Sequence, residues 1–371
     1  KMHKNAQNAT NKEVDIYNTS DLAKELLNID LAPSKIDIGK LAAEWQNEGS
    51  NYASKSDFVK DKLKHIVGGK KDAIVILYGF GRIGRIAARE LIKQAGKGQQ
   101  LRLRAIVTRG DNAVALEKRA SLLRSDSVHG AFNGTVEVDT DKRTMTINGQ
   151  TVQMIDGQQP DDIDYTAYGI NDALVIDNTG VFTNEEALSR HLKSKGVAKV
   201  ILTAPGSGIP NIVYGVNHKT DVDLNSHNIL SAASCTTNAI VPVLKVINDN
   251  LGVEKGHIET VHAYTNDQNL LDNMHKKTRR GRSAAINMVI TETGAGKAVT
   301  KVIPSLANKL TANAVRVPTP NGSLAIMNLS VGKETNIEEV NGILRKAALE
   351  GELVNQIYFG TDAETVSSDI I

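Results

Sequence analysis

The feature that most constrains the fold is a glycine pattern, Gly79-x-Gly81-x-x-Gly84, which lies between an apolar run and a helical pattern. The run from Ala73 to Tyr78 predicts a strand that is buried on both faces, and the segment after the glycines predicts an amphipathic helix. Such a turn lets the backbone approach a pyrophosphate, whose charge then faces the helix N-terminus. The pattern alone is weak evidence, but the strand, turn and helix together favour a dinucleotide site over an ordinary turn.

Further apolar runs predict parallel strands at 101–107, 173–177 and 198–202. They end in small or polar residues, as parallel strands do where their carboxyl ends face a ligand crevice. The predicted cofactor contacts are the residues of the glycine turn and the residues that follow these runs: Gly79, Phe80, Gly81, Arg82, Ile83, Gly84, Arg109, Thr179, Gly180 and Thr203.

Arg109 bears on which dinucleotide is used. An acidic residue after the second strand of a dinucleotide domain accepts hydrogen bonds from the ribose hydroxyls of NAD. Here the segment reads "VTRGDN", and an arginine beside the Thr108 hydroxyl suits the 2′-phosphate of NADP. A turn through Gly110 could bring the Asp111 carboxylate back to the ribose, and a solvated arginine is the other alternative. We expect NADP as cofactor, or both NADP and NAD.

The periodicity of apolar residues predicts three parts of the chain. Residues 1–70 form an extension with a mobile polar tail and short helices, one of which begins after a cap at Ser56. Residues 71–233 form a doubly wound (Rossmann-like) α/β domain, and residues 234–371 form an α+β domain with an antiparallel sheet. We expect the short helices to pack on the rest of the protein or on another subunit, because they could not easily stand alone.

Composition narrows the possible partners. The net charge of +2 gives no general reason to expect nucleic acid or an anionic membrane. The chain has no apolar run long enough for a membrane span and no signal-peptide pattern, so we expect a cytoplasmic protein. One cysteine cannot form an internal disulfide, so it is either buried or reactive. We expect no metal.

That cysteine, Cys235, lies in "SAASCTTNAIVP", at the start of a predicted helix. Unpaired amides at a helix N-terminus stabilise a thiolate, which would lower the pKa of the thiol. A small buried residue is the alternative. His262 in "TVHAYTNDQ" is a candidate partner, although spacing alone does not show that it reaches the thiol. The basic segment "HKKTRRGRS" could be a solvated face, a nucleic-acid patch or an anion clamp.

Seven segments, taken in order and at their separations, resemble the glyceraldehyde-3-phosphate dehydrogenase family: "YGFGRIGR", "SDSVHG", "NTGVFT", "ASCTTN", "HAYTNDQ", "ETGAGKAV" and "RVPTPN". The resemblance extends from Ala73 to Ile371. It implies that Cys235 is the nucleophile and His262 its partner. The residues that it implies for the substrate and for inorganic phosphate are Ser234, Thr236, Thr265, Asp267, Arg280, Thr293, Gly294 and Arg316.

The resemblance also implies the reaction, in which glyceraldehyde 3-phosphate and phosphate give 1,3-bisphosphoglycerate through a thioester, with hydride transfer to NAD or NADP, in glycolysis or gluconeogenesis. It implies a homotetramer built around the segment from Tyr264 to Ala285. It also implies that the basic segment binds an anion. Erythrose-4-phosphate dehydrogenases and acyl-phosphate reductases of the aspartate-semialdehyde type share this chemistry. A non-catalytic relative that acts as a binding or regulatory module is an alternative from another class.

The chain departs from the family pattern at four places. The extension has no counterpart in the ordinary enzyme, and Ala239 stands where many relatives have a second cysteine. Arg109 replaces the acidic residue typical of relatives that prefer NAD. The sequence stops at "SSDII", before the last strand and C-terminal helix of the family, so we expect the functional chain to continue beyond it.

Overall fold

The structure is a computed structural model that describes residues 15–31, 36–64, 66–67, 73–95, 101–110, 112–219, 223, 226–291 and 293–370. Asp111 and most of the polar tail lie outside these residues. Residue contacts divide the chain into two compact units. The first comprises Lys1–Leu123, Gly134–Ile176 and His191–Lys199, and the second comprises Arg124–Asn133, Asp177–Arg190 and Val200–Ile371. None of the described helices is both long and apolar enough to cross a membrane.

An eight-stranded sheet has the order β10-β9-β8-β1-β2-β7-β6-β5. Its strands are β1 (Ala73–Tyr78), β2 (Leu101–Thr108), β5 (Val136–Asp139), β6 (Thr144–Ile147), β7 (Gln150–Asp156), β8 (Ala173–Asp177), β9 (Val197–Leu202) and β10 (Ile229–Ser231). The neighbours β1, β2 and β7 run parallel, which confirms the doubly wound fold predicted from the apolar runs. Both faces of such strands are covered, which is why Val75, Ile76 and Leu77 are fully buried.

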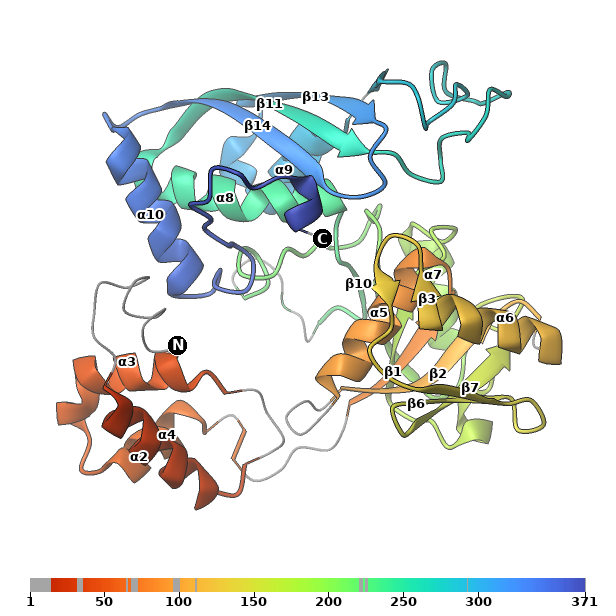
Figure 1. The fold of residues 1–371 in the computed structure, drawn as a ribbon, viewed down its shortest axis with the longest axis horizontal. Helices are drawn as coiled ribbons and strands as arrows, with labels where there is room; N and C mark the ends of the chain where they lie inside the picture. The colour runs from red at the N-terminus through yellow and green to blue at the C-terminus, as the bar shows by residue number, and fades with distance from the viewer. Residues whose placement is uncertain are drawn as a thin grey trace. The chain divides into compact units, whose positions relative to one another are not determined.

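The connections of this sheet are mostly helical (Figure 1). They are α5 (Arg82–Gln94), α6 (Ala113–Arg124), α7 (Glu185–Lys193) and the short helix η2 (Tyr165–Tyr168), together with the two-stranded ribbon β3 (Ser125–Asp126) and β4 (Gly130–Ala131). A hairpin through Asn148 and Gly149 joins β6 to β7. Both residues have positive φ, 47° and 78°, as a type I′ turn requires.

A four-stranded sheet has the order β12-β13-β11-β14. Its strands are β11 (Val253–Ala263), β12 (Val289–Thr291), β13 (Leu310–Val317) and β14 (Ser323–Val331). The helices of this region are α8 (Cys235–Leu251), α9 (Ala295–Val302) and α10 (Ile337–Leu349), with the short helices η3 (Pro304–Leu306) and η4 (Ser367–Asp369). The outer pairs β11–β14 and β12–β13 are antiparallel as predicted, but the central pair β11–β13 is parallel.

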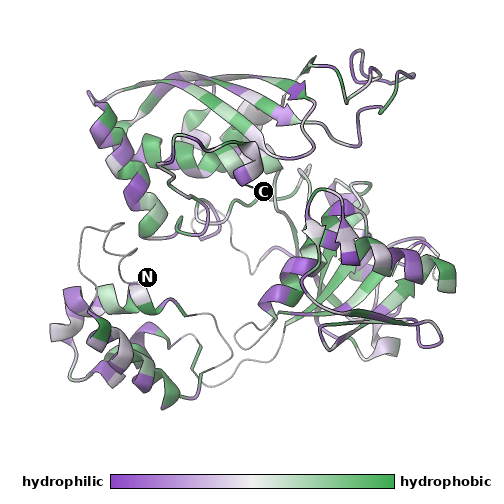
Figure 2. Ribbon diagram, in the orientation of Figure 1, coloured by the Kyte–Doolittle hydropathy of each residue, from purple (hydrophilic) through white to green (hydrophobic). Residues whose placement is uncertain are grey.

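The parallel pair has a topological reason. The chain leaves β11 and returns to β13 only after a long segment that includes β12 and α9, which is the crossover that a parallel neighbour needs. One face of the sheet packs against α8 and α9 in an apolar core that includes Ile240, Leu244, Ile258 and Val299 (Figure 2). Because side chains alternate along a strand, Ile258, Thr260 and His262 share the face that α8 covers.

The N-terminal extension folds into a small helical unit with its own core. Its helices are α2 (Ile16–Leu27), α3 (Ile38–Glu48), η1 (Gly49–Asn51) and α4 (Lys55–Lys62). The core consists of Leu22, Leu41, Ala42, Phe58, Val59 and Leu63, against which Trp45 and Tyr52 pack. The Phe58 ring makes edge contacts with Trp45 and Tyr52 at centroid distances of 5.3 and 5.2 Å. The short helices therefore pack on one another, and their packing on other parts stays a prediction.

The cap of α4 differs from the prediction. The helix begins after Ser54, not Ser56, and the Asp57 amide donates to Ser54 Oγ at 3.1 Å. Ser54 Oγ donates in return to the Asp57 carboxylate at 2.7 Å. This exchange between the cap and the third helical residue stabilises the earlier start, and it leaves Ser56 inside the first turn.

Candidate functional site

Cys235 is the first residue of α8, directly after a constrained turn. Ala233 has φ 59°, a conformation that non-glycine residues adopt rarely, and its amide donates to Ser231 Oγ at 3.0 Å. Ser234 caps the helix, since its Oγ accepts from the Thr237 amide at 3.0 Å. The turn and cap place the thiol at the helix N-terminus, and Cys235 is exposed.

The structure brings Cys235 and His262 together. The Sγ atom lies 3.7 Å from His262 Nε2, and Thr236 Oγ1 lies 4.0 Å from the same sulfur. The hydrogen bond with His262 is the main reason that the pKa of the Cys235 thiol falls from 9.0 to about 7. Partial desolvation of the sulfur opposes this shift, and the charge of His262 adds to it. The thiol is therefore largely ionised at slightly alkaline pH, which makes it a nucleophile.

His262 is held in place by backbone and arginine contacts. Its Nδ1 lies 2.7 Å from the Ala263 carbonyl oxygen, an acceptor that also receives a hydrogen bond from Arg316 Nη1 at 2.9 Å. Arg316 Nη1 lies 2.9 Å from Nδ1 as well, because His262 and Arg316 are register partners on β11 and β13. The carbonyl can only accept from Nδ1, whereas Arg316 Nη1 can only donate to it, so the two contacts belong to opposite protonation states of this nitrogen. We assign the proton to Nδ1, where it faces the Ala263 carbonyl at the shorter distance. Nε2 is then free to exchange a proton with the thiol or a substrate hydroxyl.

Two arginines lie near this pair. Burial lowers the pKa of Arg316, and the positive charge of Arg280 lowers it further, whereas the charges of Cys235 and Asp267 raise it. Arg316 Nε is buried, and no group in the described part of the chain accepts its hydrogen bond. An unsatisfied guanidinium donor beside a second arginine suits a phosphate oxygen.

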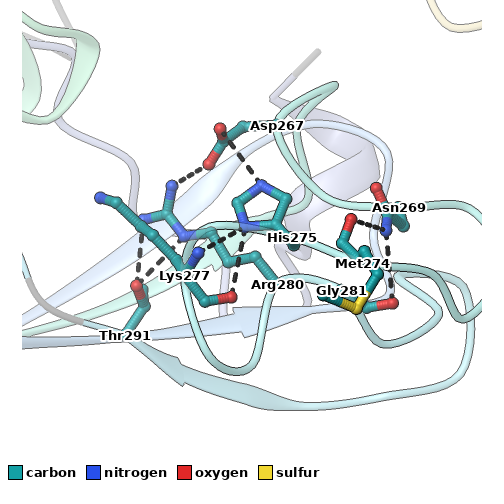
Figure 3. A network of polar contacts seen from close by, with 8 residues as sticks. All are labelled: Asp267, Asn269, Met274, His275, Lys277, Arg280, Gly281 and Thr291. Atoms are coloured by element: carbon teal, nitrogen blue, oxygen red, sulfur yellow. Dashed lines mark hydrogen bonds and ion pairs between the residues drawn. The ribbon is translucent and has the colours of Figure 1, made fainter.

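The Arg280 guanidinium donates hydrogen bonds along two of its edges (Figure 3). Its Nη1 donates to the Asp267 carboxylate, and its Nη2 and Nε donate to Thr291 Oγ1 at 3.0 and 3.3 Å. The bond from Arg280 is the main reason that the pKa of Asp267 lies below its usual value. A carboxylate cannot donate to a phosphate, so the predicted role of Asp267 in phosphate binding would be to orient Arg280.

The other predicted phosphate residues lie at two helix starts and one loop. Ser234 and Thr236 flank Cys235 at the start of α8, and Thr293 and Gly294 precede α9, whose cap is Gly294. Thr265 follows β11, and its carbonyl accepts from the Gln268 amide at 2.9 Å. Helix N-termini attract anions through their unpaired amides.

The glycine turn has the geometry that its sequence predicts. Gly79 has φ 94°, which other residues rarely adopt, and its amide donates to the Val107 carbonyl at 2.9 Å. Gly81 caps α5, and a Cβ atom added to it would meet no atom within 4 Å. Gly84 is buried in the first turns of α5. The backbone at Gly81 is therefore open to a ligand at a helix N-terminus, as a pyrophosphate requires.

The other residues of this turn differ in exposure. Phe80 is buried, Arg82 is half-buried, and Ile83 is 52% exposed. Phe80 thus anchors the turn, whereas Ile83 has an accessible surface against which a ligand could lie.

Two further predicted contacts are tied to buried Asp177 at the end of β8. The Thr179 amide and Oγ1 donate to the Asp177 carboxylate at 2.8 and 2.7 Å, and Gly180 follows with φ 67°. Thr203 Oγ1 donates to the Asp177 carbonyl at 3.0 Å. These bonds fix the strand ends that the sequence singled out.

Arg109 lies at the end of β2 with an exposed side chain, and its carbonyl accepts from Arg119 Nη2 at 2.7 Å. A second guanidinium, from α6, therefore lies at the same turn. The Gly110 amide donates to the Asp156 carboxylate, at the end of β7, at 2.7 Å. The turn thus carries two arginines and one carboxylate that is already hydrogen bonded.

Sequence reasoning missed several residues of these sites, namely Asp156, Arg119, His275 and Thr291. The polar end of the apolar run before Gly157 was an available signal for Asp156, because it follows a strand in the same way as Arg109. His275 belongs to the basic segment, but only the cations of that segment were singled out. Arg119 and Thr291 had no signal, since only the fold shows that they meet Arg109 and Arg280. In the described chain, His, Cys, Asp and Glu form no group of three that could hold a metal.

The fold and sites define a class of protein, a dinucleotide-binding dehydrogenase with a cysteine–histidine pair. Two family models match the chain: the NAD binding domain of glyceraldehyde 3-phosphate dehydrogenase over residues 73–185, and the C-terminal domain of the same enzyme over residues 234–371. The chain belongs to the glyceraldehyde-3-phosphate dehydrogenase family, which confirms the resemblance, and it is an oxidoreductase of that family with a site for a nicotinamide dinucleotide.

Similar proteins come from several bacteria. A glyceraldehyde-3-phosphate dehydrogenase-like protein of Pseudomonas aeruginosa (strain UCBPP-PA14) is 51% identical over 98% of this chain and 79% of its own length. Glyceraldehyde-3-phosphate dehydrogenase 2 of Trichormus variabilis is 41% identical over 79% of this chain and 87% of its own. The enzyme of Zymomonas mobilis is 40% identical over 80% and 84%. The Pseudomonas alignment covers nearly the whole chain, so it includes the N-terminal helices.

Proposed function

We propose that this protein oxidises glyceraldehyde 3-phosphate to 1,3-bisphosphoglycerate with inorganic phosphate, as a step of glycolysis or gluconeogenesis. The observation that carries the proposal is the contact of 3.7 Å between Cys235 Sγ and His262 Nε2, with Arg316 beside His262 and Arg280 near Arg316. A nucleophile, a base and two guanidinium groups are the parts that phosphorylating oxidation of a phosphorylated aldehyde needs.

The Cys235 thiolate, whose proton His262 Nε2 has taken, attacks the aldehyde carbon and forms a hemithioacetal. Sulfur is then bonded to carbon, and the former carbonyl oxygen becomes a hydroxyl by taking that proton back from His262 Nε2. His262 Nε2 takes the hydroxyl proton as the carbon is oxidised to a thioester. A nicotinamide dinucleotide, held at the glycine turn from Gly79 to Gly84, supplies the acceptor for the hydride when it is bound.

Phosphate then attacks the thioester carbon and releases the acyl phosphate, which returns the Cys235 thiolate. Arg280, Ser234, Thr236, Thr293 and Gly294 would hold the attacking phosphate. Arg316 and Thr265 would hold the phosphate of the substrate, with Asp267 orienting Arg280. The buried and unsatisfied Nε of Arg316 supports this assignment. Preorganised donors matter here because they stabilise developing charge without rearranging.

For the cofactor we propose NADP, or use of both NADP and NAD. The residues that would hold its phosphates and nicotinamide end are those of the glycine turn with Thr179, Gly180 and Thr203. The support for NADP is the exposed Arg109 side chain and the second guanidinium of Arg119 at the same turn. The Asp156 carboxylate at this turn accepts a hydrogen bond from the Gly110 amide at 2.7 Å.

We further propose a cytoplasmic homotetramer that binds neither nucleic acid nor membranes. The domain limits would be residues 1–70, 71–233 and 234–371, which the starts of the two family models at Ala73 and Ser234 support. The tetramer would be built around the segment from Tyr264 to Ala285, which carries large exposed apolar side chains.

The deciding experiment measures formation of reduced cofactor with glyceraldehyde 3-phosphate and phosphate at about pH 8, where the Cys235 thiol is mostly ionised. Turnover should fall by at least about 10³-fold in Cys235→Ala, since the chain has no other thiol, whereas cofactor affinity should stay nearly unchanged. Ala239→Ser, an exposed change one turn along α8, is the matched control and should retain activity. Preference for erythrose 4-phosphate, or turnover by Cys235→Ala, would contradict the proposal.

A further inference from the structure

The Asp267 carboxylate lies between two groups that can each hold it (Figure 3). Its Oδ2 accepts from Arg280 Nη1, and its Oδ1 lies 3.7 Å from His275 Nε2. The His275 and Arg280 side chains are both 12% exposed, whereas Asp267 is 41% exposed. Because one carboxylate interacts with both partners, a change of charge on His275 changes the electrostatic attraction between Asp267 and Arg280.

The backbone of Lys277 offers His275 two alternative partners. The Lys277 amide donates to His275 Nδ1 at 2.9 Å, so a neutral ring carries its proton on Nε2, toward Asp267. The Lys277 carbonyl oxygen lies 3.2 Å from the same Nδ1. A ring protonated on both nitrogens can therefore exchange the amide for the carbonyl while its Nε2–H still faces Asp267. Both charge states fit one position of the ring.

We propose that His275 is a proton-linked positioning residue, which sets how strongly Asp267 holds Arg280 and so how strongly the site binds a tetrahedral dianion. The inference rests on the proposed role of Arg280 in binding inorganic phosphate. With His275 neutral, Asp267 competes with the anion for Nη1 of Arg280. With His275 charged, the carboxylate is shared between two cations and Arg280 is released toward the anion.

The sign of the effect follows from the charges. Adding a proton to His275 adds a positive charge next to Asp267, so anion affinity rises as pH falls. By reciprocity, anion binding at Arg280 favours uptake of a proton by His275. Among the described residues, the charge of Lys277 also acts on Asp267, and the charges of Arg280 and Asp267 both act on Arg316.

Two other titrations must be separated from that of His275. Phosphate itself changes charge near neutral pH, so sulfate, which stays a dianion, is the better probe. The Cys235 thiol ionises at about 7 and its charge acts on Arg316, so every protein compared carries Cys235→Ser. His262 is present in all of them, so its contribution cancels when each variant is compared with the Cys235→Ser parent.

The test measures sulfate affinity of the full chain by calorimetry at about pH 6 and about pH 8.5, on either side of the usual histidine range. The affinity of the parent for sulfate should be about three- to tenfold higher at the lower pH. A tenfold change corresponds to a difference of about one unit in the pKa of the linked group between the free and the bound protein. His275→Gln keeps an N–H donor toward Asp267 but cannot be charged, so it should lose most of this extra pH dependence. Asp267→Asn should bind sulfate tightly at both pH values.

His257→Gln is the matched control. His257 lies on β11, where it contacts Thr311 Oγ1 at 2.7 Å and Asn313 Oδ1 at 3.2 Å, so its replacement should leave the parent's pH dependence intact. The same pH dependence in His275→Gln as in the parent would overturn the inference, and so would an absence of sulfate binding. If the pH dependence of sulfate affinity requires His275 but the unmodified protein turns over no aldehyde, the inference is supported and only the proposed function is contradicted.

Discussion

The reactivity of the Cys235 thiol depends mainly on its contact with His262, so its pH dependence can be predicted. The pKa lowered to about 7 means that the thiolate fraction rises as pH increases through neutrality. We expect the rate of alkylation by iodoacetamide to be half-maximal near that pH. In His262→Asn the hydrogen bond and charge are lost, so the midpoint should move up toward the ordinary value of 9.0.

The measurement is a series of alkylation rates from about pH 5 to 10, a range that covers ordinary and activated thiols. His257→Asn serves as the control, because His257 lies on the same strand but contacts β13 residues instead of the thiol. The same midpoint in His262→Asn and in the unmodified protein would show that the contact in the structure does not activate the sulfur.

Arg109 supports a second residue-scale prediction, on cofactor choice. Arg109→Asp removes a cation that suits the 2′-phosphate and adds an anion that repels it. The ratio of kcat/KM for NAD over NADP should therefore rise by at least about tenfold. Arg104→Asp, an equal change of charge at an exposed position of β2, should leave the ratio nearly unchanged. Strict NAD use by the unmodified protein would show that Arg109 does not face the ribose.

At the residue scale, residue types and their local sequence patterns predicted part of the site. The single thiol before a helical pattern predicted Cys235, but it left His262 only a candidate. The meeting of the two depends on the register of β11 and on packing of α8 against one face of the sheet. His275 could not be assigned for the same reason, since its partner Asp267 comes from another segment. Asp156 could have been singled out because it follows an apolar run, but its contact with Gly110 could not be predicted.

At the scale of elements, the N-terminal helices carry a core of their own, which predicts separate unfolding. Phe58 is fully buried between Trp45 and Tyr52, and replacing a buried phenylalanine by alanine costs about 3–5 kcal/mol. A unit of this size has only a few kcal/mol of stability, so Phe58→Ala should unfold it. Amide hydrogen exchange should show lost protection in 16–62 and unchanged protection in α8.

Tyr17→Ala is the control for this experiment, because that aromatic side chain is 77% exposed on α2 and should be replaceable with little effect. Loss of protection in α8 together with the extension would show that the two parts unfold as one. Full protection in Phe58→Ala would show that the small core does not hold these helices.

Apolar periodicity predicted most elements but not all of their details. Strand β1 was visible because buried parallel strands are continuously apolar, and β2 was visible from its apolar residues Ala105 to Val107. The parallel pairing of β11 with β13 was not, since strand direction depends on the path of a long connection. The cap of α4 was misplaced by two residues because Ser54 and Ser56 are both good caps, and only the partner Asp57 decides between them.

At the scale of the whole molecule, the segment after β11 supports the proposed tetramer. Leu270, Leu271 and Met274 are 72, 75 and 91% exposed, which is a large apolar surface for one loop to leave in water. Burial of these side chains between subunits would stabilise an assembly, and a charge in their place would oppose it. Met274→Glu should therefore shift the mass measured by light scattering from four chains toward two or one. Ile337→Glu, at a position that is 79% exposed on α10, is the matched control and should leave the assembly intact. If the unmodified protein is a monomer at micromolar concentration, or if both variants dissociate it equally, the loop is not the contact that holds subunits together.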